Sequence, residues 1–131
     1  MDTKTLKKPV VLVVEDRDIF KKSYESIIQP ATSELLFAPT AKEALAIIHQ
    51  RGNSIDLIVV DIDLPDPTLK GMKLINAIRK KNKRVMIIMI AEHQWSAKKQ
   101  EKYQGIIDEF YFKSEEITKL ENIIRQYIRL V

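Results

Sequence analysis

Cysteine is absent from the 131-residue chain, and only three glycines are present. The absence of cysteine excludes a disulfide framework, a zinc site with thiolate ligands and a catalytic cysteine. With so few glycines, the sequence holds no glycine-rich phosphate-binding loop. Its first residues lack the apolar segment of a signal peptide, and no apolar run approaches the roughly 20 residues that span a bilayer. We therefore expect a cytoplasmic protein that makes no contact with a membrane.

The charge of the chain is close to balanced. Lys and Arg together number 22 and Asp and Glu 18, which gives a net charge of +4. Hydrophobic residues make up 45% and charged residues 31%, a composition typical of one globular domain. A charge this small does not indicate nucleic-acid binding, so we expect no direct contact with nucleic acid.

Short apolar runs recur every 22 to 29 residues, which is enough for one strand, one helix and two loops. They are rich in Val and Ile with little polar alternation, as is typical of strands that are covered on both faces. The runs begin at Val10, Leu35, Leu57, Met86 and Phe110.

Amphipathic helical patterns separate these runs. The segment from Ser96 to Ile106 carries only a weak pattern of this kind. The alternation predicts an α/β fold of the (βα)5 type, a doubly wound parallel sheet with right-handed crossovers. The clear stripes are formed by Phe20, Tyr24, Ile27 and Ile28, by Ala41, Ala44, Leu45 and Ile48, by Met72, Ile75 and Ile78, and by Ile117, Leu120, Ile124, Ile128 and Val131.

Charged residues follow three of the predicted strands, where ligands bind in open parallel sheets. Glu15 and Asp16 follow the first strand, Asp61 and Asp63 the third, and Lys113 the fifth. Four carboxylates that converge repel one another unless a cation lies among them, and oxygen ligands alone favour Mg²⁺ or Mn²⁺. An aspartate beside such an ion and an ammonium group is placed to attack phosphorus. The alternative is that each acid is a helix cap or a solvated loop charge.

The charged residues that follow the predicted strands belong to three motifs, Val-Val-Glu15-Asp16, Val-Val-Asp61-Ile-Asp63-Leu-Pro65 and Phe-Tyr-Phe-Lys113. These motifs are similar to those of response regulator receiver domains. The resemblance implies a CheY-like, flavodoxin-like fold with five strands in the order 2-1-3-4-5. It covers residues 10–131 as one domain, preceded by an N-terminal tail over residues 1–9.

The resemblance also implies roles for these residues in a two-component phosphorelay. Asp61 resembles the aspartate that accepts a phosphoryl group from a histidine kinase or phosphotransfer protein. Asp16 and Asp61 would bind Mg²⁺ or Mn²⁺ through side chains, Asp63 through its backbone carbonyl, and Glu15 through water or as a further ligand. Lys113 would pair with the acceptor carboxylate and then with the phosphoryl group. Such a domain catalyses its own phosphorylation, and we do not class it as an independent enzyme.

The sequence departs from the family pattern at its switch positions. Ile90 stands where the family has a Thr or Ser that bonds the phosphoryl group, while Ala91 keeps the small residue that lies beside that group. The partner aromatic is Phe110, which has no hydroxyl, and Ser114 replaces the usual proline after the lysine. A lost hydrogen bond to a charged group costs about 1.5–3 kcal/mol. Phosphorylation of Asp61 remains expected with weaker switching, and the alternative is a pseudo-receiver that does not switch.

Partners and other functions follow from the same motifs. The resemblance implies that the face of the fourth helix, fifth strand and fifth helix contacts an output domain or a second copy. Asp61-Ile-Asp63 also resembles the motif of haloacid-dehalogenase-type phosphatases, and together with Glu15 that of Toprim-like nucleic-acid enzymes. The basic segment 79–84 is most simply a solvated helix end, because basic residues are favoured there by the helix dipole.

Overall fold

The computed structural model describes residues 9–31, 34–66 and 68–128, whose strands form one sheet in the order β2-β1-β3-β4-β5. All four neighbouring pairs are parallel, which confirms the predicted sheet and its order. The strands are β1 (Val10–Val14), β2 (Glu34–Ala38), β3 (Leu57–Asp61), β4 (Met86–Ala91) and β5 (Glu109–Phe112).

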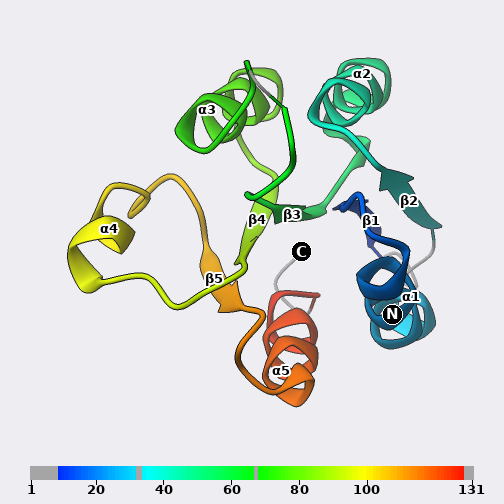
Figure 1. Ribbon diagram of the computed structural model, residues 1–131. Coiled ribbons are helices and arrows are strands. Elements are labelled where there is room, and N and C mark those ends of the chain that lie inside the picture. Colours follow the sequence, from blue (N-terminus) through cyan, green and yellow to red (C-terminus); the bar gives the residue numbers. More distant parts are fainter. Residues whose placement is uncertain (1–8, 32–33, 67, 129–131) are drawn as a thin grey trace, which may run out of the picture.

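Helices cover both faces of the sheet, with α2 (Ala41–Arg51) and α3 (Met72–Lys81) on one side and α1 (Asp18–Ile28) and α5 (Ile117–Ile128) on the other (Figure 1). Helix α1 ends at Ile28 because Pro30 has no N–H for a further α-helical hydrogen bond. The short 3-10 helix η2 (Gln29–Ala31) follows it directly. A second 3-10 helix, η3 (Gly52–Ser54), follows α2. In the described part of the chain, the remaining α-helix is the short α4 (Ala97–Glu101).

Parts of two sequence expectations lie outside the described residues. They are the tail up to residue 8 and the end of the last apolar stripe at Val131. Pro9, the last residue of the expected tail, is buried. Within the described ranges, no helix is both long and apolar enough to cross a membrane.

The core consists of two apolar clusters, one on each face of the sheet. Every residue of β1 and β3 is buried, as expected of strands that are covered on both sides. Leu12 belongs to the cluster under α2 and α3, whereas its neighbour Val13 belongs to the cluster under α1 and α5. This alternation follows from the strand geometry, in which successive side chains point to opposite faces.

The short helix α4 is held by aromatic side chains outside it. None of its own five residues is buried, which explains the weak apolar pattern of this segment. Trp95, just before the helix, packs on Tyr103, Phe110 and Phe112 with ring centroids 5.2 Å, 5.9 Å and 6.2 Å away. Such aromatic pairs anchor the segment without needing a helical stripe.

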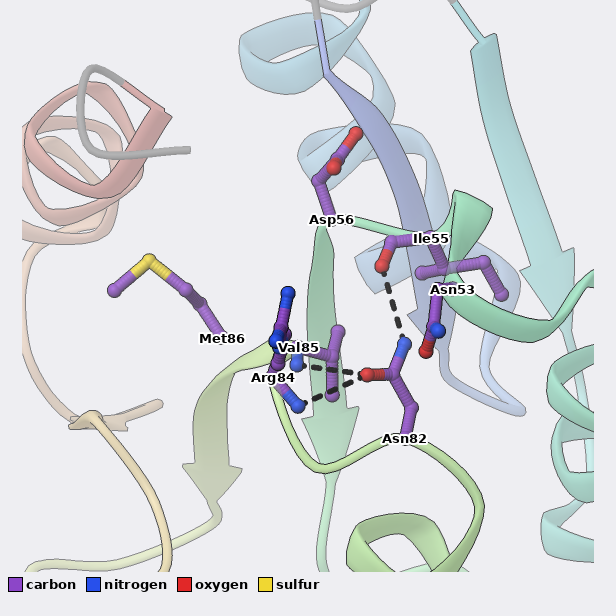
Figure 2. Close-up of a pocket in the computed structure, with 7 residues that line it drawn as sticks. All are labelled: Asn53, Ile55, Asp56, Asn82, Arg84, Val85 and Met86. Carbon is purple, nitrogen blue, oxygen red and sulfur yellow. Dashed lines mark hydrogen bonds between the residues drawn. The ribbon is translucent and has the colours of Figure 1, made fainter.

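Asn82 fixes the turn between α3 and β4, at the end of the sheet opposite the predicted site. Its side-chain amide donates to Gly52 O and Ile55 O at 3.4 Å and 3.3 Å, and its Oδ1 accepts from the N–H groups of Arg84 and Val85 at 3.0 Å each. Figure 2 shows this side chain between the two loops that line a hollow of about 390 Å³. The residue is 2% exposed, so its bonds replace water that cannot reach these backbone groups.

Replacing Asn82 with alanine is expected to lower the free energy of unfolding by about 2 kcal/mol, because buried backbone groups lose their partners. Urea denaturation measures the change. Asn53→Ala provides the matched control, since Asn53 lines the same hollow but is exposed. Equal losses in the two variants would contradict the role assigned to the Asn82 hydrogen bonds.

Candidate functional site

The ends of β1, β3 and β5 carry the predicted site residues at one edge of the sheet. Asp61 is the last residue of β3, while Glu15 and Lys113 directly follow β1 and β5. Hydrogen bonds extend the ladder past both strands, from Glu15 N to Ala38 O at 3.1 Å and from Lys113 N to Ala91 O at 2.8 Å. The backbone hydrogen bonds of the sheet therefore fix the positions from which the side chains of Glu15, Asp61 and Lys113 extend.

Lys113 joins two carboxylates in a buried ion-pair group. Its Nζ lies 2.8 Å from Asp61 Oδ2 and 3.3 Å from Glu15 Oε1. The side chains of Lys113 and Asp61 are each 3% exposed and that of Glu15 is 0% exposed. The ammonium also sits 3.9 Å from the centroid of the Phe20 ring, a favourable cation–π distance. One cation thus faces two carboxylates in a place that water hardly reaches.

Three carboxylates at this edge could share a metal ion. Ligand oxygens of Glu15, Asp16 and Asp61 all lie within 4.8 Å of one another. Burial and the negative charge of Asp61 raise the pKa of Glu15 to about 7, against the opposing effect of Lys113. Glu15 Oε1 has no hydrogen bond and only the ion-pair contact with Lys113, and Asp16 is exposed, so the group is open to solvent on one side. An all-oxygen donor set of this kind fits a hard divalent cation such as Mg²⁺.

The side chain of Asp63 turns away from this group of carboxylates. Its Oδ2 accepts a hydrogen bond from Glu92 N at 2.7 Å, while its own N–H donates to Asp61 Oδ1 at 2.8 Å. The structure therefore brings together three of the four predicted carboxylates and uses the fourth to hold the end of β4. A role for Asp63 through its backbone carbonyl stays a prediction.

An ion pair between Arg17 and Glu92 lies next to the site, and no motif or spacing in the sequence predicts it. Arg17 Nη2 lies 2.7 Å from Glu92 Oε1 although the residues are 75 positions apart. The Arg17 N–H donates to Glu15 Oε2 at 3.2 Å, and its guanidinium carbon lies 4.5 Å from the Phe20 ring centroid. The pair ties the start of α1 to the segment after β4, so it links the two sides of the site.

The predicted switch positions occupy opposite faces of the sheet. Ile90 pairs with Asp61 in the β3–β4 register and is buried in the cluster under α1 and α5. Phe110 packs on the other face, beside Trp95. Ala91 pairs with Phe112 one step further along β4. No hydroxyl from β4 therefore faces Asp61, as expected from the isoleucine at position 90.

The basic segment at the end of α3 divides into two parts. Arg79 is built into the fold, since its guanidinium donates to Ile106 O at 2.8 Å and pairs with Asp108 at 3.3 Å. The remaining basic side chains are exposed, in agreement with the interpretation as a solvated helix end. They are Lys80, Lys81, Lys83 and Arg84.

Comparison with protein families and curated proteins gives consistent matches. The family model of the response regulator receiver domain matches residues 11–125. The two-component response regulator ORR26 of Oryza sativa subsp. japonica is 27% identical over 91% of this chain and 20% of its own length. The transcriptional regulatory protein CitT of Halalkalibacterium halodurans is 27% identical over 91% of this chain and 52% of its own length. The chain thus spans about half or less of these relatives.

Solved structures share the fold at lower sequence identity. A response regulator receiver domain protein from Clostridium thermocellum has a TM-score of 0.77 at 22% identity, over 93% of this chain and 95% of that one. The chemotaxis protein CheY4 of Vibrio cholerae has a TM-score of 0.75 at 21% identity, over 92% of this chain and 98% of that one. Both likenesses support the same doubly wound fold.

Proposed function

The chain belongs to the family of response regulator receiver domains, the signalling modules of two-component systems, and from this membership we propose that Asp61 is its phosphoacceptor. The donor would be a histidine kinase or a phosphotransfer protein. One observation carries the proposal: Asp61 lies within reach of both a buried ammonium group and two further carboxylates. The arrangement suits a carboxylate that must attack phosphorus and then carry a dianionic group.

The chemistry requires only a positioned carboxylate and compensating positive charge. A carboxylate oxygen of Asp61 forms a bond to phosphorus while the bond from phosphorus to the donor nitrogen breaks, and that nitrogen keeps the electron pair. Lys113 Nζ, already 2.8 Å from Asp61 Oδ2, offsets the charge that the phosphoryl oxygens bring. The N–H of Asp63 holds Asp61 Oδ1 and fixes the carboxylate plane. When bound, Mg²⁺ or Mn²⁺ would supply further positive charge, held by Glu15, Asp16, Asp61 and the backbone carbonyl of Asp63.

We place the output contacts of this domain on the face formed by α4, β5 and α5. The exposed α4 buries none of its own residues, and Ile117 at the start of α5 is 43% exposed. The curated relatives are longer than this chain, so an output domain or a second copy are the two occupants we propose for that face.

Incubation with acetyl phosphate and Mg²⁺ tests the phosphoacceptor. We expect a hydroxylamine-labile adduct in the unchanged chain and its complete loss in Asp61→Asn, because an amide oxygen does not attack phosphorus. Asp66→Asn is the control, since Asp66 only caps the loop after β3 through Thr68 and Leu69. An adduct that survives in Asp61→Asn would refute the assignment, and failure with acetyl phosphate and with kinases would favour a pseudo-receiver. Steady hydrolysis of phosphate esters would favour a phosphatase, and metal-dependent nicking of DNA a Toprim-like enzyme.

A further inference from the structure

The hydroxyl of Tyr24 is a buried donor without a partner. The residue is 1% exposed, and its Oη is one of two buried side-chain atoms in the described ranges that make no hydrogen bond. The other atom is Glu15 Oε1, which lies in the ion-pair group described above. A buried hydroxyl that lacks a partner is costly, so its presence calls for a physical explanation.

Tyr24 leans toward the phosphoacceptor end of the sheet. Helix α1 begins just after β1 and runs back along the sheet, and helical side chains tilt toward the start of their helix. The ring of Tyr24 stacks on that of Phe20 with centroids 6.2 Å apart, and Phe20 in turn contacts Lys113 Nζ. Tyr24 and Lys113 also line one hollow of about 240 Å³ between α1 and the start of α5.

The charges of the site reach this hydroxyl. The pKa of Tyr24 is raised by burial first, and then by the negative charges of Glu15 and Asp61. Tyr24 also belongs to the same apolar cluster as Ile90, the β4 residue that pairs with Asp61 and offers no donor. Within this cluster, α1 thus contributes a hydroxyl without a partner, whereas the β4 residue beside Asp61 contributes no hydroxyl.

We propose that the Tyr24 hydroxyl is a positioning group that gains its hydrogen bond when Asp61 carries a phosphoryl group, directly or through one water in the adjoining hollow. A phosphoryl group adds strong acceptor oxygens where the unmodified site offers this hydroxyl none. A donor that is unsatisfied in one state and satisfied in the other favours the second state. Tyr24 thus supplies from α1 the contact that Ile90 cannot supply from β4. This inference rests on the proposed function of Asp61.

Beryllofluoride with Mg²⁺, a non-covalent mimic of the phosphoryl group, tests the proposal as an equilibrium. Its Kd is measured by NMR titration of backbone amides. We expect Tyr24→Phe to bind beryllofluoride roughly tenfold more weakly than the unchanged chain, the effect of one hydrogen bond to a charged group. The unfolding free energy of ligand-free Tyr24→Phe should not fall, because the substitution removes an unsatisfied hydroxyl.

Two further variants separate this role from a structural one. Tyr111→Phe is the matched control, because Tyr111 lines the same hollow but its hydroxyl already donates to Glu115 O at 2.9 Å. Its Kd should stay within about twofold of the unchanged value. Adding Ile90→Thr to Tyr24→Phe should recover most of the lost affinity, since it supplies a hydroxyl from β4 instead.

Each outcome decides the proposal. Weaker binding in Tyr24→Phe, with normal binding in Tyr111→Phe and recovery by Ile90→Thr, supports it. An unchanged Kd in Tyr24→Phe overturns it, as does an equal loss in Tyr111→Phe or a loss of stability alone. If the unchanged chain forms no adduct on Asp61 and binds no beryllofluoride, the proposed function itself fails and this inference fails with it.

Discussion

Replacing Lys113 with methionine is expected to lower the free energy of unfolding by about 4 kcal/mol in metal-free protein near pH 8. The ammonium is the only cation within ion-pair distance of Asp61 or Glu15 among the residues that the structure describes. Its removal leaves two carboxylates in contact in a buried place, and an uncompensated buried charge is strongly destabilising. Methionine replaces the apolar stem of lysine as far as Cε and lacks only the ammonium group, so the loss chiefly reports charge rather than packing.

Urea denaturation at matched ionic strength measures the change in unfolding free energy caused by Lys113→Met. A second series of measurements is made in the presence of Mg²⁺. Mg²⁺ should restore part of the lost stability, because a cation among the carboxylates replaces the missing charge. Lys119→Met is the control, since Lys119 pairs with Glu115 on the exposed side of α5 and such pairs contribute about 0.5 kcal/mol or less. A loss in Lys113→Met no larger than in Lys119→Met would show that the buried ion-pair group is not what stabilises this edge.

Replacing Glu15 with glutamine is expected to stabilise the metal-free protein by about 3 kcal/mol above neutral pH and to do little below about pH 4.5. The pKa of Glu15 rises from 4.5 to about 7 on folding, so the folded state holds a proton that the unfolded state releases. Stability is therefore greatest below pH 4.5 as far as this group is concerned, and it falls as pH rises through 7. Glutamine has no proton to lose in this pH range, so Glu15→Gln removes this contribution to the pH dependence of stability.

Unfolding free energies of both proteins across the pH range, measured in the presence of EDTA, provide the test. The difference between Glu15→Gln and the unchanged chain should grow between pH 4.5 and 7 and then level off. Glu25→Gln on the exposed side of α1 is the control and should change stability by less than about 0.5 kcal/mol throughout. A difference that shrinks with rising pH would reverse the sign and refute the raised pKa.

The strands and the edge that carries the site could be predicted because both depend on local order in the sequence. Continuous apolar runs at β1 and β3 indicated strands covered on both faces, and the fold then requires their ends to meet. Asp61 and Lys113 are in contact although 52 positions separate them, as the parallel sheet predicted. The resemblance then gave each of these residues a role that spacing alone could not.

Other parts of the site could not be predicted because they depend on tertiary contacts. The apolar stripe that contains Tyr24 identified the buried face of α1. It could not show that the Tyr24 hydroxyl has no hydrogen-bond partner. Nothing in the sequence pairs Arg17 with Glu92, or directs the Asp63 carboxylate toward the end of β4. The position of α4 could not be predicted either, because it depends on Trp95, which lies outside the helix and packs on the rings of Tyr103 and Phe110.

The aromatic group around Trp95 gives the protein an internal optical reporter. Trp95 is the only tryptophan in the chain, so its emission comes from one place. Its ring packs on Phe110 and lies 4.2 Å from Lys99 Nζ, on the α4 side of the sheet, whereas Ile90, which pairs with Asp61, is buried on the α1 side. A change in tryptophan fluorescence on phosphorylation would therefore show that the signal has crossed the sheet, and an unchanged spectrum that it has stayed on the side of Tyr24.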